Sequence, residues 1–278
     1  MKKRILIIAC AAVTVAAVIA ASVIPINAFG NSVFDGHIKS IILYAVCIPW
    51  LSYLIKTLGY KPFGKPVNAA CFFVALLVAV NNFPFFPFFK GNSYIVNSGF
   101  AYVAVFVVYC AFTAAFEELL FRGILFGVIY ESSKKTKYGA LKAIALSSVA
   151  FGLAHFLNLL GGAGFMSTLM QVGYTTLIGA LCAFVAFKTR NLIFPWLIHA
   201  VYNVCGLLLS TSGIGNGIHF DTETVVITAV IGVFTGAFAL WTMLKKTDDE
   251  ECADYARAVL GLKEDKTVVK EDKNGKTE

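Results

Sequence analysis

Charge is scarce in this chain of 278 residues, because Asp, Glu, Lys and Arg make up 14% of it while apolar residues make up 58%. Soluble globular domains contain about a quarter charged residues, so the composition excludes an ordinary soluble domain. Acidic residues are especially few outside residues 245–278, which hold ten of the 16. The long uncharged runs predict an all-α, polytopic integral membrane protein.

Several local signatures are missing as well. The seven cysteines form no CxxC pair, which argues against a disulfide framework or a zinc knuckle. No HExxH sequence is present, so there is no local zinc motif. No basic stripe with interleaved aromatic residues occurs, so a nucleic-acid partner is not expected. The partner that the composition does imply is the lipid bilayer.

Apolar runs bounded by turn residues or charges predict about eight transmembrane helices. Residues 1–97 hold the first three, residues 98–244 hold the remaining five, and residues 245–278 form a charged tail. We expect the tail to be disordered, apart from a short surface helix within 249–262. The first run follows Lys2-Lys3-Arg4 as in a signal peptide, but its length favours a retained helix over a cleaved one. The expected spans are 5–24, 38–55, 67–82, 98–130, 140–159, 166–187, 192–210 and 224–244.

The distribution of Lys and Arg predicts the orientation. With the N-terminus inside, every inside loop carries at least two bases and no outside loop carries more than one. Both termini are therefore expected in the cytoplasm. The outside bases are Lys39 and Lys90; the inside bases are Lys2, Lys3, Arg4, Lys56, Lys61, Lys65, Lys134, Lys135, Lys137, Lys142, Lys188, Arg190, Lys245 and Lys246.

Few strongly polar side chains interrupt the apolar spans. Charged groups in hydrocarbon cost about 2.5–3.5 kcal/mol each by insertion scales, so a chain that keeps them there is expected to use them. His37 and His219 lie at or beyond span ends and are expected to be solvated, whereas Asn158 and Gln171 are expected to hold helices together. The remaining candidates are Glu117, Glu118, Arg122, His155, His199 and Asn203.

Helix geometry assigns these residues provisional roles. Glu118 and Arg122 are at i, i+4 with the acid first, the favoured order for an intrahelical ion pair. Glu117 is rotated about 100° around the helix from Glu118, so it can face a different neighbour and stays available for chemistry. His199 and Asn203 share one helix face and are placed to donate hydrogen bonds to an oxyanion.

Two chemistries remain open at this point. A carboxylate beside a histidine can hold and deprotonate a water for peptide hydrolysis. Alternatively, Glu117, His155 and His199 form a His₂Glu set for a divalent metal such as zinc, as in a metalloprotease.

Three patterns together carry a resemblance: Glu117-Glu118-x-x-x-Arg122, Phe151-x-x-x-His155 and His199-x-x-x-Asn203. In this order they resemble the CPBP family (also called ABI or CAAX protease) of intramembrane endopeptidases, which includes the type II CAAX prenyl endopeptidases. The resemblance covers roughly residues 100–210. It implies an intramembrane catalytic cavity in which Glu117 activates water with help from His155. His199 and Asn203 would stabilise the oxyanion, and Glu118 and Arg122 would support the first motif.

The same resemblance implies a peptide or membrane-protein substrate, including one with a lipidated C-terminus, and allows bacteriocin or other peptide processing. The short loops and the Lys-Lys-Arg start favour a bacterial plasma membrane. Two other classes stay open: a proton-coupled transporter, because intramembrane carboxylates and histidines also mark proton relays, and a non-catalytic immunity or binding protein of the same fold.

Overall fold

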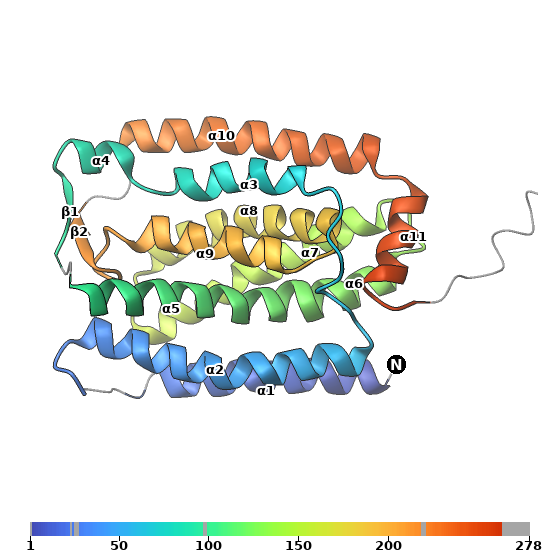
Figure 1. Ribbon diagram of the computed structural model, residues 1–278, viewed down its shortest axis with the longest axis horizontal. Helices are drawn as coiled ribbons and strands as arrows, with labels where there is room; N and C mark the ends of the chain where they lie inside the picture. Colours follow the sequence, from blue (N-terminus) through green and yellow to red (C-terminus); the bar gives the residue numbers. More distant parts are fainter. Residues whose placement is uncertain (1, 23, 25–27, 97–98, 218–220, 263–278) are drawn as a thin grey trace, which may run out of the picture.

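The computed structural model describes residues 2–22, 24, 28–96, 99–217 and 221–262. His219 and the expected disorder of residues 263–278 lie outside this described part. Within it the chain is a bundle of nearly parallel and antiparallel helices (Figure 1). The elements are α1 (Lys2–Ser22), α2 (Ser32–Leu58), α3 (Ala70–Asn81), α4 (Phe85–Phe89), β1 (Ser93–Ile95), α5 (Phe100–Glu118), η1 (Leu119–Leu125), α6 (Phe126–Ser133), α7 (Gly139–Ala154), η2 (His155–Gly161), α8 (Phe165–Thr189), α9 (Ile193–Leu207), β2 (Gly215–Gly217), α10 (Thr222–Trp241), η3 (Thr242–Lys246) and α11 (Asp249–Ala258).

Local signals explain where several helices begin and end. The side chain of Asn31 caps α2 by accepting from the main-chain nitrogens of Val33 and Phe34, and Gly59 ends the helix in the left-handed conformation with a φ of 87°. Asp221 caps α10 in the same way by accepting from the nitrogen of Thr224. Hydrogen bonds from Thr224 and Lys90 lower the pKa of Asp221 to about 2.

Six of the described helices are long and apolar enough to cross a membrane. The other two expected spans are shorter: α3 has 12 residues and α9 has 15. At about 1.5 Å of rise per residue, these two reach only part of the way through a hydrocarbon core of about 30 Å. The all-α membrane fold is confirmed, whereas the count of eight full spans stays a prediction.

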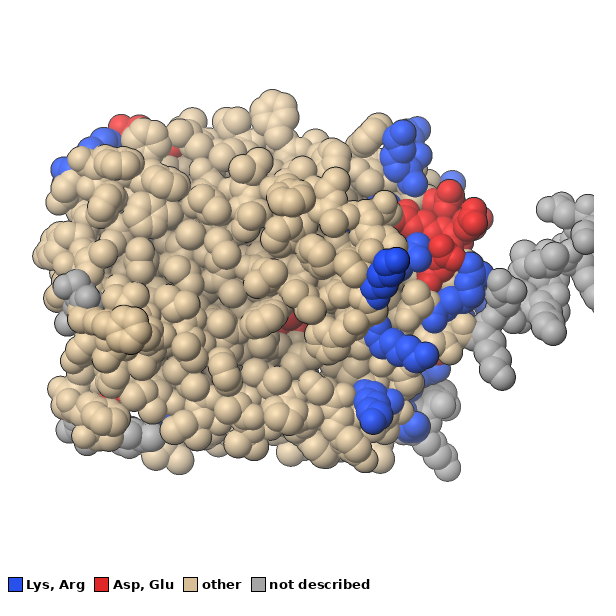
Figure 2. Space-filling model, in the orientation of Figure 1, with Lys and Arg blue, Asp and Glu red and all other residues tan. Residues whose placement is uncertain are grey.

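The two ends of the bundle gather the loops as the charge pattern predicted. At one end, here called the charged end, Arg4 pairs with Glu131, and Lys188 pairs with Glu251 at 2.6 Å. At the opposite end, Lys90 pairs with Asp221 and Glu223. Figure 2 shows charged side chains at both ends and a wide, almost uncharged belt between them, interrupted by a small acidic patch. The orientation with the charged end in the cytoplasm remains a prediction.

The opposite end also holds a small sheet that the sequence did not suggest. Strands β1 and β2 pair antiparallel, with Tyr94 opposite Asn216. His37 lies nearby and is buried rather than solvated as expected, because its ring stacks on Tyr109 and its Nε2 is 2.9 Å from the carbonyl oxygen of Ser212.

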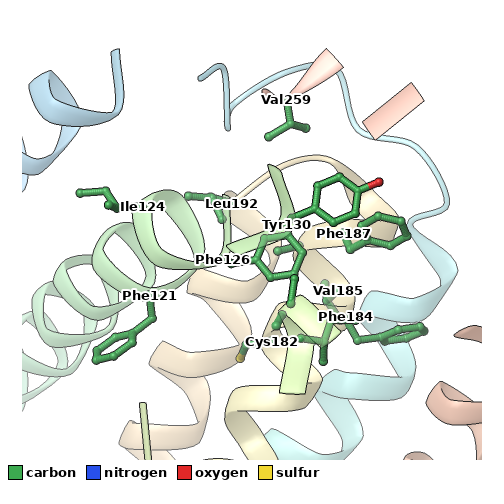
Figure 3. Close-up of a cluster of buried hydrophobic side chains, with 14 of the residues drawn as sticks. Phe121, Ile124, Phe126, Tyr130, Cys182, Phe184, Val185, Phe187, Leu192 and Val259 are labelled. Atoms are coloured by element: carbon green, nitrogen blue, oxygen red, sulfur yellow. The ribbon is translucent and has the colours of Figure 1, made fainter. Parts of the chain in front are cut away.

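The short helix expected at the start of the charged tail is present as α11, but one of its faces is buried in the core instead of lying on the surface. In α11 the ring of Tyr255 is buried against three aromatic rings, those of Phe126, Tyr130 and Phe187. Figure 3 shows the rings of Phe126, Tyr130 and Phe187 together, with Val259 nearby. Apolar side chains every three to four residues let this short helix dock on the bundle even though its other face is acidic.

Candidate active site

The candidate site begins where the long helix Phe100–Ser133 changes its winding. After Glu118 the α-helix passes into the π-helical segment η1, which contains Arg122. Single π-turns inside α-helices are rare and are frequent at functional sites. Gly123 allows this segment to approach α2, because a Cβ here would lie 2.6 Å from a side-chain carbon of Ile55.

The expected ion pair is present along this helix. Nη1 of Arg122 donates to Oε1 of Glu118 at 2.9 Å, and both side chains are almost fully buried. Nη2 of Arg122 donates to the carbonyl oxygen of Gly179 on α8 at 2.8 Å, and the guanidinium lies 4.5 Å from the ring centre of Phe151. The pair therefore fixes α5 against α7 and α8 as well as balancing charge.

His199 on α9 lies between the two carboxylates. Its Nδ1 is 2.8 Å from Oε1 of Glu118, and its Nε2 is 3.4 Å from Oε2 of Glu117. A carboxylate only accepts hydrogen bonds, so Nδ1 carries the proton shared with Glu118, and Nε2 is directed at Glu117. Glu117 is the more accessible acid, with 22% of its side chain exposed against 2% for Glu118.

The site also concentrates buried polar atoms that lack partners. Four buried side-chain atoms in the described residues have no hydrogen bond, and three of them lie within ten residues of one helix: Oγ1 of Thr113, Oε2 of Glu118 and Nε of Arg122. Such atoms are few in folded proteins and call for an explanation where they cluster. The helix between Thr113 and Arg122 therefore leaves hydrogen-bonding groups unsatisfied, which helix packing alone does not explain.

The other two predicted residues, His155 and Asn203, are connected to the site through neighbouring residues. Nδ1 of His155 lies 3.0 Å from the carbonyl oxygen of Phe151, so this nitrogen donates and Nε2 is left as the acceptor. The ring of Phe151 packs edge-on against both His155 and His199, at centroid distances of 5.0 and 5.6 Å. Asn203 lies one turn beyond His199 on α9 and is partly buried.

These positions do not fit the His₂Glu metal set. Across the described residues, no three His, Cys, Asp or Glu side chains are arranged to hold a metal ion. The water-activating arrangement around Glu117 stays a prediction.

The larger of two described cavities lies elsewhere. It has a volume of about 490 Å³ and is bounded by α3, α8, α10, η3 and α11 near the charged end. A smaller cavity of about 10 Å³ borders Arg122 and Gly123, where Tyr255 and Leu260 of the C-terminal segment face it. The catalytic cavity around Glu117 remains a prediction.

Residues 98–205 match the family model described as "Type II CAAX prenyl endopeptidase Rce1-like". This segment belongs to the CAAX protease family. The match runs from α5 to α9 and so includes all six predicted site residues. Neither the curated proteins nor the solved structures gave a match. The match of this segment supports an intramembrane protease as the general activity.

Two contributors to the site were missed from the sequence. Gly179 supplies the carbonyl oxygen that holds Arg122, and a Cβ on it would lie 2.9 Å from Phe151 and 3.0 Å from Nη2 of Arg122. Thr113 lies one turn before Glu117 on the same face of α5. A glycine within an apolar helix was the one available signal for the first, since small residues allow close helix contact.

Proposed function

We propose that this protein is an intramembrane endopeptidase in which Glu117 activates the water that cleaves a peptide bond. The observation that carries the proposal is the position of His199, held by Glu118 on one side and facing Glu117 on the other. One proton is available to be shared between Nε2 of His199 and Oε2 of Glu117. This is the arrangement that a general base needs in order to take and return a proton.

The other residues take supporting roles in this proposal. The amide of Asn203, on the same helix face as His199, donates to the oxyanion that forms on the scissile carbonyl. The Nε2 of His155, left as an acceptor, assists Glu117 once substrate and water are bound. Glu118 and Arg122 hold His199 in the orientation that points Nε2 at Glu117.

The substrate class follows from the family and from the position of the site. A peptide bond reaching Glu117 belongs to a membrane protein or a membrane-associated peptide, because the site lies within the apolar belt. A lipidated C-terminus is one such substrate, since the lipid would remain in the bilayer while the peptide enters the site. With the charged end in the cytoplasm of a bacterial cell, the substrate is processed from the plasma membrane.

A matched pair of variants tests the activity. Purified wild-type protein, Glu117→Gln and the control Glu223→Gln are compared on candidate membrane-anchored peptides in liposomes, and on whole membranes by proteomics of new peptide ends. The expected result is loss of cleavage in Glu117→Gln, with normal folding, and retention in Glu223→Gln. Full cleavage by Glu117→Gln would falsify the proposal. Activity should also survive a metal chelator, because the mechanism uses no metal ligand set.

A further inference from the structure

Three hydroxyl groups lie next to Glu117 on the side facing the opposite end of the bundle. Tyr109, Thr113 and Glu117 recur every four residues on α5 and so form one stripe. Tyr44 approaches from α2, where its ring stacks on Phe116 with a centroid distance of 4.9 Å and an angle of 22°. We call Tyr44, Tyr109 and Thr113 the hydroxyl triad.

The triad contains a buried oxygen without a well-formed hydrogen bond. Oγ1 of Thr113 is buried and has no hydrogen-bond partner among the described residues. The hydroxyls of Tyr44 and Tyr109 are its polar neighbours: both lie close enough to interact with Thr113, without meeting the geometry of a hydrogen bond, and both lie in the electrostatic field of Glu117. Four oxygen-bearing groups therefore converge from two helices on one small region, although no direct bond of good geometry satisfies Thr113.

Such a set has the chemistry of a hydration site. A buried water needs two to four polar partners, and groups left unsatisfied by direct bonds are the ones that water usually serves. The hydroxyls of Tyr and Thr both donate and accept, whereas a carboxylate such as that of Glu117 only accepts. A water among them can accept from the triad and donate to Glu117, which is the orientation needed by a nucleophile awaiting deprotonation.

We propose that the hydroxyl triad binds and positions water for Glu117. This inference rests on the proposed endopeptidase function and assigns three residues to it that the sequence motifs do not contain. Hydrolysis consumes one water per bond: its oxygen bonds to the carbonyl carbon, one hydrogen passes through Glu117 to the leaving nitrogen, and the C–N bond breaks. In an apolar belt, a dedicated site for that water keeps Glu117 supplied between turnovers.

Polar groups continue from the triad toward the opposite end. His37 stacks on Tyr109 at a centroid distance of 4.3 Å, and its Nε2 reaches the carbonyl oxygen of Ser212 in the loop after α9. The hydration site is thus linked to a loop at the bundle surface by polar side chains rather than enclosed in hydrocarbon.

Conservative substitutions separate this role from a packing role. Thr113→Val keeps the volume and removes the hydroxyl, while Thr113→Ser restores a hydroxyl in a smaller side chain. Tyr109→Phe and Tyr44→Phe remove the other two. We expect each loss to lower kcat about tenfold with little change in KM, because the water is not part of substrate binding. Thr113→Ser should retain most of the activity.

The controls are Thr235→Val on α10 and Tyr53→Phe on α2, which should leave both constants unchanged. A second readout needs no turnover: X-ray hydroxyl-radical labelling, which is strong where ordered water contacts a side chain. Tyr109 and Tyr44 should be labelled in wild-type protein and less so in Thr113→Val, with the labelling of Tyr53 unaltered.

The outcomes separate this inference from the function on which it rests. Normal kcat in Thr113→Val, or an equal loss in Thr113→Ser, overturns the hydration site, and so does absence of labelling at both tyrosines. If Glu117→Gln is inactive in the same assay, the endopeptidase proposal survives that result. If Glu117→Gln is fully active, the endopeptidase function fails and the inference fails with it.

Discussion

His199 donates from Nδ1 to Oε1 of Glu118 across the α5–α9 contact, at a distance of 2.8 Å. The same oxygen accepts from Arg122 at 2.9 Å, so one atom joins three helical segments. A histidine whose Nδ1 proton is held by a carboxylate has a fixed ring orientation and a defined second nitrogen. Glu118 is therefore more than the partner of Arg122: it sets which nitrogen of His199 faces Glu117.

The first prediction removes that control while keeping the shape of the side chain. Glu118→Gln should reduce kcat about 100-fold or more, because an amide can present its NH₂ group to His199 and favour the wrong tautomer. KM should change little, since Glu118 is buried away from substrate. Steady-state kinetics on the peptide cleaved by wild type provide the measurement. A Glu118→Gln enzyme with unchanged kcat would show that the orientation of His199 does not matter for turnover.

The second prediction separates charge balance from catalysis. Arg122→Met leaves Glu118 buried without its cation, which should lower the free energy of unfolding by about 3–5 kcal/mol. Adding Glu118→Gln removes the orphaned charge and should recover much of this stability, but not the activity. Unfolding of the three variants in detergent checks the stability, and cleavage assays check the function. Equal destabilisation of the single and double variants would contradict a buried-charge origin.

Sequence patterns predicted much of the fold because the membrane limits the alternatives. Long uncharged runs must form helices, and Lys and Arg at their ends predict the loops that meet at each end of the bundle. The i, i+4 spacing predicted the Glu118–Arg122 pair directly. Its neighbour could not be predicted in the same way, because the contact between His199 and Glu118 depends on how α9 packs against α5.

Other features depended on packing that leaves no periodic signal. In the π-helical segment after Glu118 the backbone bonds span five residues instead of four, and nothing in the sequence of Leu119–Leu125 signals this change. The contact of Phe151 with both His155 and His199 likewise depends on how the helices meet. The docking of α11 was underestimated because charge dominates its composition, while a few apolar residues determine its burial.

A third prediction concerns the close contact at Gly179. Gly179→Ala should displace Phe151 or Arg122, because its Cβ would lie within 3.0 Å of both side chains. We expect at least a tenfold loss of kcat and a loss of about 1–3 kcal/mol of stability from overpacking. Gly173→Ala on the same helix is the matched control, since nothing lies within 4 Å of its added Cβ. Equal kcat and equal stability of the two variants would mean that the close contact at Gly179 matters neither for turnover nor for folding.

The last prediction tests whether the C-terminal segment is a structural part of the bundle. Tyr255 is 3% exposed and packs against Phe126, Tyr130 and Phe187, so Tyr255→Ala should cost about 3–5 kcal/mol, in the range of large aromatic truncations. The neighbouring exposed Glu250→Ala should cost little. Limited proteolysis provides a local readout: cleavage at sites within residues 245–262 should become faster in Tyr255→Ala and not in Glu250→Ala. Rapid cleavage of this segment in wild-type protein would instead restore the expectation of a loose tail, because a segment whose buried rings hold it to the bundle is not available to a protease.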